Sequence, residues 1–273
     1  MSRARSVLYL PASNARAVKK ARGLACDVAV LDLEDAVAPE MKAEARAAAV
    51  AAAREGGFGP RLGVRINGLD TPWRADDLAA LRDAPVDLIV APKVESAATV
   101  RALSEGINSS VELWAMIETP RALVDLREIA ESGGALKGLM LGVNDLAKEL
   151  KTGASPDREP LKPWLAAVVA HARANGLLAL DGVFNRIKDE TGFAAECSQG
   201  RLYGFDGKSL IHPSQIEAAN AAFGPTAEEI AWARRVVAAF AAPEAEGLGV
   251  LRVEGEMVER LHLAAAEALL GGL

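Results

Sequence analysis

Short apolar runs alternate with alanine-rich helical runs along most of this chain, and this alternation constrains the fold more than any other feature. The apolar runs are nearly continuous, as expected for parallel strands that are buried on both faces of a sheet. Eight runs are expected to form strands, and they span residues 6–11, 28–35, 61–67, 88–95, 112–119, 138–145, 177–184 and 201–213.

Helices are expected between these runs. Pro39 opens PEMKAEARAAAVAAAR, which is rich in strong helix formers, and Pro72 precedes WRADDLAALRDA in the same way. Alternating strands and helices form parallel sheets with right-handed crossovers, and eight such units predict a closed (β/α)8 barrel of the α/β class. An open doubly wound sheet is the rival, but LPASNARAVKK after the first strand lacks its GxGxxG fingerprint.

The last part of the chain has a different pattern. We predict a barrel over residues 1–224 and a C-terminal helical extension over residues 225–273. In the extension, Thr226 and Glu229 are spaced for a capping box, and LGVLRVEGEMVERLHLAAAEALL resembles a hairpin or extended turn followed by a helix. Because a barrel does not need this extension, we expect it to pack on, or swap with, a neighbouring subunit.

Composition excludes several classes of function. A net charge of −6 without a basic cluster argues against a nucleic-acid partner, which requires a basic stripe. The first apolar run is broken by Pro11 and is too short for a signal peptide or a membrane span. Cys26 and Cys197 lack CxxC spacing and are expected to be free thiols in a reducing compartment. We therefore expect a cytoplasmic protein with no membrane partner.

Charged and amide side chains gather toward the ends of the predicted strands. Because the carboxyl ends of barrel strands converge on one rim, where active sites lie, these residues predict a charged active-site mouth. Capping of the next helix is a simpler role for Asp35 and Asp145. The residues concerned are Asp32, Glu34, Asp35, Arg65, Asn67, Lys93, Glu95, Glu118, Asn144, Asp145, Asp181, Asp206, Lys208 and His212.

The residue types at this mouth favour a hard metal ion. The chain has only three histidines and no HExxH or His-Cys cluster, which argues against zinc. Glu118 and Asp145, on adjacent predicted strands, suit Mg²⁺, which takes one or two protein carboxylates and leaves positions for substrate and water. The fork of Arg65 suits a carboxylate or a developing enolate oxygen, and its alternative role is an ion pair with an acid of the second strand.

The segment GFDGKS, from Gly204, resembles the end of a phosphate-binding P-loop. That motif requires a glycine five residues before the Gly-Lys pair, and Leu202 occupies this position. The segment also continues into LIHPSQ rather than directly into a helix. Nucleotide binding of this type is therefore not expected.

Six motifs together resemble the citrate lyase β-subunit-like and malyl-CoA lyase family. The resemblance implies a (β/α)8 barrel, a Mg²⁺ cofactor, CoA-thioester substrates and assembly into a homotrimer or hexamer. The motifs occur in the family's order, each at its expected strand end, and they are LDLEDAV (31–37), VRIN (64–67), PKVES (92–96), MIETP (116–120), GVNDLA (142–147) and GFDGKSLIHPSQI (204–216).

The resemblance also implies roles for individual residues. The family's metal ligands fall on Glu118 and Asp145, and its substrate-binding, catalytic arginine falls on Arg65. The backbone amides of Asn144 and Asp145 are similar to those that hold the oxo-acid half of the substrate. Its CoA-binding segments fall on Ser13, Asn14, Lys19, Lys20, His212 and Pro213, with Lys19 and Lys20 as phosphate contacts or, alternatively, as part of a solvated helix face.

Three positions depart from the family's pattern. Pro11-Ala12 replaces a usual Pro-Gly pair after the first strand, and Asn144 replaces a frequent glutamate before the metal-binding aspartate. In the tail, GEMVERLH places Glu259 where the family has an aspartate that reaches into a neighbour's active site as acid or base. Glu259 is therefore a candidate catalytic residue with a longer side chain.

The function expected from these residues is a Mg²⁺-dependent CoA-ester lyase. It would cleave a carbon–carbon bond in a 3-hydroxyacyl-CoA of citryl-CoA or malyl-CoA type, giving acetyl-CoA, or another acyl-CoA, and a 2-oxo acid. A metal-dependent aldolase acting on free 2-oxo acids and the β subunit of a larger citrate lyase complex are the alternatives. A barrel kept only as a binding protein fits poorly, because both metal carboxylates and Arg65 are present.

Overall fold

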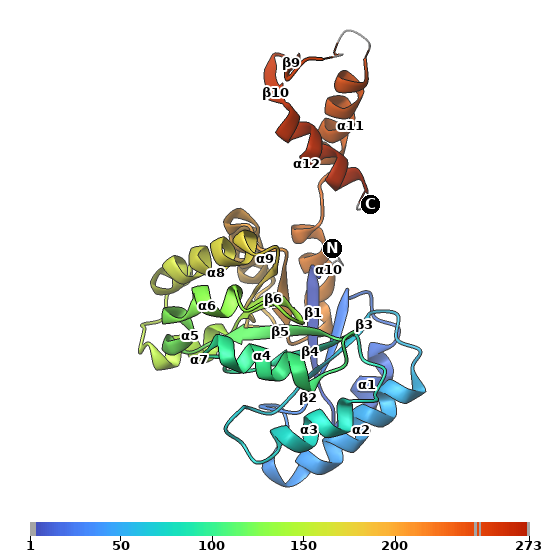
Figure 1. The fold of residues 1–273 in the computed structure, drawn as a ribbon, viewed down its shortest axis with the longest axis vertical. Coiled ribbons are helices and arrows are strands. Elements are labelled where there is room, and N and C mark those ends of the chain that lie inside the picture. Colours follow the sequence, from blue (N-terminus) through green and yellow to red (C-terminus); the bar gives the residue numbers. More distant parts are fainter. Residues whose placement is uncertain (1–3, 243–244, 246, 272–273) are drawn as a thin grey trace. The chain divides into compact units, whose positions relative to one another are not determined.

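The computed structural model describes residues 4–242, 245 and 247–271 (Figure 1). The chain divides into two compact units, Met1–Phe223 and Gly224–Leu273. Among the described residues, none of the helices combines the length and the apolar composition that a membrane span requires.

The first unit contains a closed barrel, and the predicted (β/α)8 fold is confirmed. In its described part, eight parallel strands pair with their neighbours in chain order, and the last strand pairs with the first. The strands are β1 (Ser6–Pro11), β2 (Val28–Asp32), β3 (Arg61–Arg65), β4 (Leu88–Ala91), β5 (Glu112–Ile117), β6 (Leu136–Leu141), β7 (Leu178–Asp181) and β8 (Gly207–Leu210).

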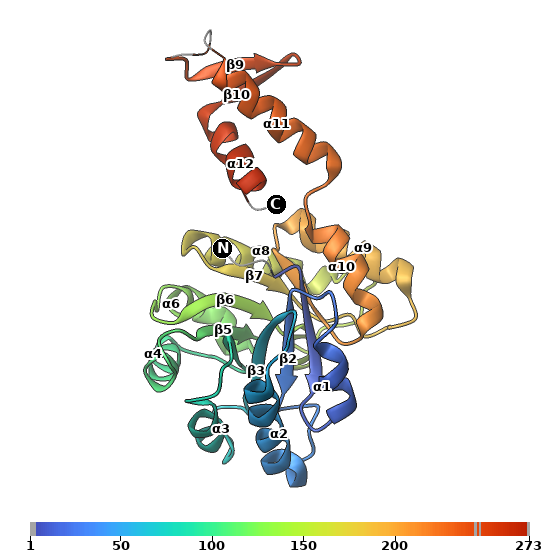
Figure 2. The ribbon, with the colours of Figure 1, turned by 90° about the vertical axis from the view of Figure 1, so that its right-hand side faces the viewer.

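Helices connect the strands and lie outside the barrel (Figures 1 and 2). The α-helices of this unit are α1 (Ala15–Ala21), α2 (Lys42–Glu55), α3 (Arg74–Leu81), α4 (Ala97–Gly106), α5 (Pro120–Val124), α6 (Leu126–Ala130), α7 (Val143–Glu149), α8 (Lys162–Ala174), α9 (Glu190–Tyr203) and α10 (Ile216–Phe223). Short 3₁₀ turns are η1 (Pro39–Met41), η2 (Glu159–Leu161) and η3 (Pro213–Gln215).

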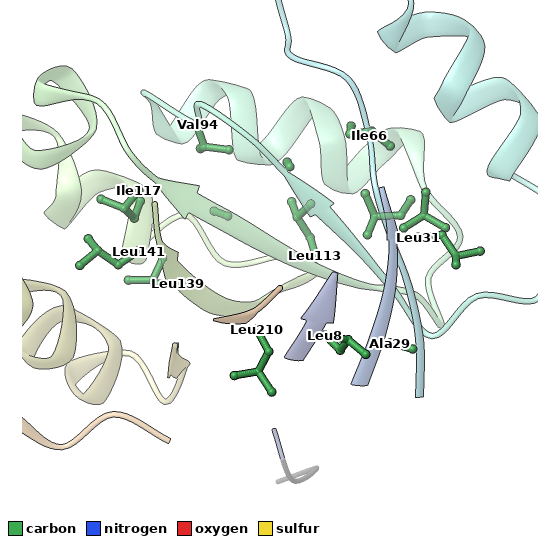
Figure 3. Close-up of a cluster of buried hydrophobic side chains, with 14 of the residues drawn as sticks. Leu8, Ala29, Leu31, Ile66, Val94, Leu113, Ile117, Leu139, Leu141 and Leu210 are labelled. Atoms are coloured by element: carbon green, nitrogen blue, oxygen red, sulfur yellow. The ribbon is translucent and has the colours of Figure 1, made fainter. Parts of the chain in front are cut away.

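Alternation along the strands separates two apolar cores. Residues such as Val30, Trp114 and Met140 form one buried cluster, which fills the barrel interior. The residues between them, such as Leu31 and Leu139, belong to a larger buried cluster that packs beneath the helices (Figure 3). Because both faces of each strand are buried, the strands are apolar almost throughout.

The second unit has a small core of its own. It comprises α11 (Ala227–Ala241), an antiparallel hairpin of β9 (Val250–Val253) and β10 (Glu256–Glu259), and α12 (Arg260–Gly271). The expected capping box starts α11, with the Glu229 backbone N–H donating to Thr226 Oγ1 over 3.1 Å. The predicted contact between this unit and a neighbouring subunit stays a prediction.

The last barrel strand differs from the prediction. Arg201–Tyr203 ends helix α9 rather than starting a strand, and Gly204 closes that helix with a φ of 96°. A glycine in this conformation is a common helix terminator, so the signal was present in the sequence. β8 begins only at Gly207, where an added Cβ would overlap the carbonyl oxygen of Ala4, so no other residue fits there.

Candidate active site

A cavity of about 410 Å³ opens at the carboxyl ends of the barrel strands. Its lining combines carboxylates and one guanidinium with an apolar wall. The polar lining residues are Tyr9, Asp32, Asp35, Arg65, Glu118, Asn144, Asp145, Asn185 and Ser209. The cavity therefore brings together Arg65, Glu118, Asn144 and Asp145, as the sequence predicted.

Glu118 follows β5 directly and is only 3% exposed. Its Oε1 accepts a hydrogen bond of 2.8 Å from the Lys93 backbone N–H. The next residue, Thr119, caps α5 by accepting from the Ala122 N–H, and Pro120 is the first residue of that helix. The Thr-Pro turn thus ends the strand and starts the helix, which fixes the direction of the Glu118 side chain.

The surroundings of Glu118 disfavour the charged form of its carboxyl group. Burial, together with the charge of Asp145, raises the pKa of Glu118 to about 7, although the Lys93 amide and Arg65 oppose the rise. Burial lowers the pKa of Lys93, but the carboxylates of Glu34, Asp145 and Glu118 outweigh it, and the net shift is upward. The mouth therefore holds more acidic groups than its nearby cations balance.

Asp145 and Asn144 lie in the first turn of α7, which Gly142 precedes. No side chain caps this helix, so Asp145 does not have the capping role that was its alternative. The first backbone N–H groups of a helix have no acceptor within the helix, and here they border the cavity. The Asn144 side chain is exposed and exchanges hydrogen bonds with Asn185 over 2.8 and 3.3 Å.

Arg65 forms the ion pair that was the alternative to a direct role. Its Nε and Nη2 donate to the two carboxylate oxygens of Asp32 over 2.7 and 2.6 Å. Its Nη1 lies 2.9 Å from Glu34 Oε2, and the guanidinium stacks 5.0 Å from the Tyr9 ring centroid. Arg65 still lines the cavity, so the ion pair fixes its orientation there.

Glu34 is a second buried carboxylate near the cavity. Burial raises its pKa to about 7, although Arg65 opposes the rise. Its Oε2 is buried and, despite the short distance to Arg65, has no hydrogen bond of good geometry. Asp35 beside it is exposed and caps no helix, since the next helical turn begins at Pro39 after Ala38.

Four residues near the cavity were not predicted from the sequence, and one of them is Asn185. Tyr9 and Ser209 line it from β1 and β8, and their inward direction follows from the two-residue strand period. Ser209 Oγ is buried without a hydrogen-bond partner, and the Tyr9 hydroxyl donates to the Met140 thioether over 2.7 Å. Lys42 is buried, and its ammonium donates to the Leu33 and Glu34 carbonyl oxygens, which orders the segment after β2. Nothing in the sequence pattern indicated this role of Lys42.

The residues at this site fit a magnesium ion. Among the described residues, no cluster of three or more His, Cys, Asp or Glu side chains has metal-binding geometry, so a closed protein cage is absent there. Glu118 and Asp145 line one cavity and could supply two hard oxygen ligands, which is the protein share that Mg²⁺ typically takes. A divalent cation would also stabilise the charged form of Glu118, which burial and the charge of Asp145 disfavour.

The residues predicted to bind CoA follow two neighbouring strands, since β1 and β8 pair. Asn14 caps α1 through its side chain, and Lys19 and Lys20 are exposed in the last turn of that helix. His212 caps η3, with its ring accepting from the Ser214 N–H. The six predicted residues, Ser13, Asn14, Lys19, Lys20, His212 and Pro213, are outside the cavity lining, and their role stays a prediction.

Four residues predicted at the mouth have other partners. The outward-facing Asp181 and Lys208 form a buried ion pair of 3.1 Å, and Arg158 and Glu196 complete this network. Asp206 precedes β8, at the amino end of the barrel, and pairs with Arg173. The buried Asn67 donates to Asp77.

Glu259 ends β10 in the second unit, where its backbone N–H donates to the His262 ring over 2.9 Å. A role for Glu259 in a neighbour's active site stays a prediction.

Comparisons with known proteins identify the family. The family model "HpcH/HpaI aldolase/citrate lyase" matches residues 5–213. A (3S)-malyl-CoA thioesterase of Cereibacter sphaeroides is 47% identical, over 97% of this chain and 93% of its own. The citrate lyase subunit beta of Leuconostoc mesenteroides is 35% identical, over 97% of this chain and 92% of its own.

A solved structure has the same architecture. Protein CitE of Mycobacterium tuberculosis, in complex with magnesium, acetoacetate and coenzyme A, has a TM-score of 0.80 and 34% identity, and the match covers 99% of this chain and 98% of that one. The resemblance seen in the six motifs is confirmed, as is the expectation of an enzyme. The chain belongs to the HpcH/HpaI aldolase/citrate lyase family of enzymes.

Proposed function

We propose that this protein is a Mg²⁺-dependent lyase that acts on a CoA ester of a short 3-hydroxy acid, of malyl-CoA or citryl-CoA type. One observation carries the proposal: the carboxylates of Glu118 and Asp145 line a single cavity together with Arg65. The magnesium and coenzyme A bound by the M. tuberculosis relative support the same assignment.

Glu118 and Asp145 would hold the ion, and the free amides of the first α7 turn would bind the carboxylate that becomes part of the 2-oxo acid. When bound, Mg²⁺ lowers the pKa of a hydroxyl and polarises a developing carbonyl. With its orientation fixed by Asp32, Arg65 places positive charge beside the oxygen that becomes negative during cleavage.

The proposed cleavage breaks the bond between the carbon that bears the hydroxyl and the carbon next to the thioester. The hydroxyl gives its proton to water and becomes the carbonyl of the 2-oxo acid, and the electron pair of the broken bond passes to the thioester fragment. A proton added to that fragment completes acetyl-CoA. We assign this proton to Glu259 of a neighbouring subunit, which agrees with the predicted homotrimer or hexamer.

Thioester hydrolysis is a second candidate, because the C. sphaeroides relative of 47% identity is a (3S)-malyl-CoA thioesterase. Hydrolysis breaks the carbon–sulfur bond with water and gives free CoA and the hydroxy acid. A citrate lyase β subunit is a further candidate, favoured by the relatives of that name. A metal-dependent aldolase on free 2-oxo acids would need neither the thioester nor the predicted CoA-binding residues.

Product analysis separates these reactions. The purified full chain is incubated in parallel with malyl-CoA, citryl-CoA, a free 2-oxo acid or a carrier-bound thioester. Each reaction contains Mg²⁺ or a chelator, and the products are resolved by liquid chromatography. Acetyl-CoA and a 2-oxo acid formed only with Mg²⁺ support the lyase, whereas free CoA and the hydroxy acid support the thioesterase. Turnover of free 2-oxo acids alone would support the aldolase, and activity only with carrier-bound thioesters would support the subunit.

A further inference from the structure

Lys93 has an unusual backbone conformation at the edge of the active site. It follows β4 after Pro92 and has a φ of 50°, in the left-handed region that non-glycine residues rarely adopt. In the described part of the chain, only Lys93, Lys151, Arg158 and Glu254 share this property. Such conformations persist where the surrounding structure requires them, and they concentrate at functional sites.

The contact made by this backbone explains why the conformation is kept. The Lys93 N–H donates to Glu118 Oε1 over 2.8 Å, and Glu118 is buried at the end of β5. The other face of the carboxylate lies against Gly142, where an added Cβ would overlap Oε2. Oε1 of Glu118 is therefore held by the Lys93 amide, and Oε2 lies against the backbone of Gly142, which has no side chain.

We infer that Lys93 is a positioning residue, whose left-handed backbone aims its N–H at Glu118 and thereby sets the affinity of the site for a divalent cation. This inference rests on the proposed function, in which Glu118 is a ligand of the ion. Because a ligand on a rotatable side chain loses conformational freedom when it binds, holding Glu118 in advance strengthens binding.

Substitutions separate the backbone from the side chain of Lys93. Glycine and asparagine adopt positive φ readily and keep the N–H, so K93G and K93N preserve the contact with Glu118. They also remove an ammonium that lies among carboxylates and would repel a cation. Valine, branched at Cβ, strongly disfavours this conformation, so K93V turns the amide away from Glu118.

Lys151 provides a matched control. Its φ is 55°, its side chain is exposed, and its N–H donates to the Lys148 carbonyl oxygen rather than to a site residue. K151V therefore introduces the same backbone conflict without touching Glu118.

The experiment measures Mn²⁺ binding to the full chain by electron paramagnetic resonance, with Mg²⁺ as competitor and without substrate. K93G and K93N are expected to bind Mn²⁺ as tightly as the wild type or more tightly, K93V at least about tenfold more weakly, and K151V unchanged. Thermal melting checks that each variant is folded. If K93V does not fold, K93A takes its place and is expected to bind more weakly than K93G.

Two results would overturn the inference: equal Mn²⁺ affinity of K93V and K93G, or a loss in K93G as large as that in K93V. The second result would assign the effect to the Lys93 side chain rather than to its backbone. Failure of the proposed function would give a different result. The Mn²⁺ affinities of the wild type and the variants would then follow the expected order, but the wild type would turn over none of the CoA esters.

Discussion

Gly142 lies against Glu118 so closely that an added Cβ would overlap both Oε2 and Cβ of the glutamate. Because Glu118 Cβ is fixed by its strand, G142A is expected to displace the carboxylate. A displacement of about 1 Å costs on the order of 100-fold in rate, so we predict a loss of this size in Mg²⁺-dependent turnover. Steady-state kinetics with a Mg²⁺ titration measures it.

Gly153 is a suitable control, since nothing lies within 4 Å of the position of its Cβ. G153A is expected to keep wild-type turnover and melting temperature. Wild-type kinetics in G142A would show that the fit between these two residues has no role in the reaction.

Asp32 balances the buried charge of Arg65 through two hydrogen bonds. D32N removes that charge, and breaking a buried pair in this way costs about 3 kcal/mol. We therefore predict that the free energy of unfolding in urea falls by about this amount. D35N changes a carboxylate that is 65% exposed and 3.5 Å from Arg65, and its expected cost is below about 1 kcal/mol. Equal losses of unfolding free energy in D32N and D35N would show that the buried pair of Asp32 with Arg65 does not stabilise the fold more than the exposed Asp35 does.

Asp181 should make stability depend on pH in the acid range. Burial raises its pKa, but Lys208 and Arg158 outweigh this and hold the pKa below the ordinary value. A carboxyl with a lowered folded-state pKa stabilises the fold above its unfolded pKa, about 3.9, and this contribution is lost as pH falls through the folded pKa. Urea unfolding at a series of pH values should show this loss below about pH 4.

The D181N variant has no such carboxyl. It is expected to be less stable at neutral pH and to lose less stability on acidification than the wild type. The same slope of stability against pH in both proteins would mean that Asp181 does not carry the effect.

Two buried serines on adjacent strands should respond in opposite ways to removal of the hydroxyl. Ser6 Oγ donates to Asn220 and accepts from the Asp27 N–H, so S6A leaves two partners unsatisfied and should cost about 1–3 kcal/mol. Ser209 Oγ is buried without a hydrogen-bond partner, so S209A should leave stability unchanged or raise it. Thermal melting of both variants tests this, and a marked loss in S209A would show that its hydroxyl has a partner.

The barrel was predictable because alternation of apolar strands with helices is a property of local sequence. The ends and faces of strands were less predictable. In β7 both Leu180 and Asp181 are buried, so the pattern alone did not show that Asp181 points away from the mouth. Its partners Arg158 and Lys208 come from distant segments, and only the folded chain brings them together.

The site was predicted in part for a similar reason. Glu118, Asp145 and Arg65 were found because each follows or ends an apolar run, and parallel strand ends meet on one rim. The left-handed backbone of Lys93 had no signal, since lysine rarely adopts it. The sequence likewise does not show why position 142 is a glycine. The reason is the close approach of the Glu118 side chain, which exists only in the folded chain.

If Glu118 holds a catalytic divalent cation, its removal should abolish turnover, and a comparison of wild-type protein with E118A tests this. Both are assayed with malyl-CoA and citryl-CoA across a Mg²⁺ titration, by release of 2-oxo acid, with melting curves to confirm folding. We predict Mg²⁺-dependent release by the wild type and none above background by a folded E118A. Full activity of E118A, with the same dependence on Mg²⁺, would show that Glu118 does not hold the ion.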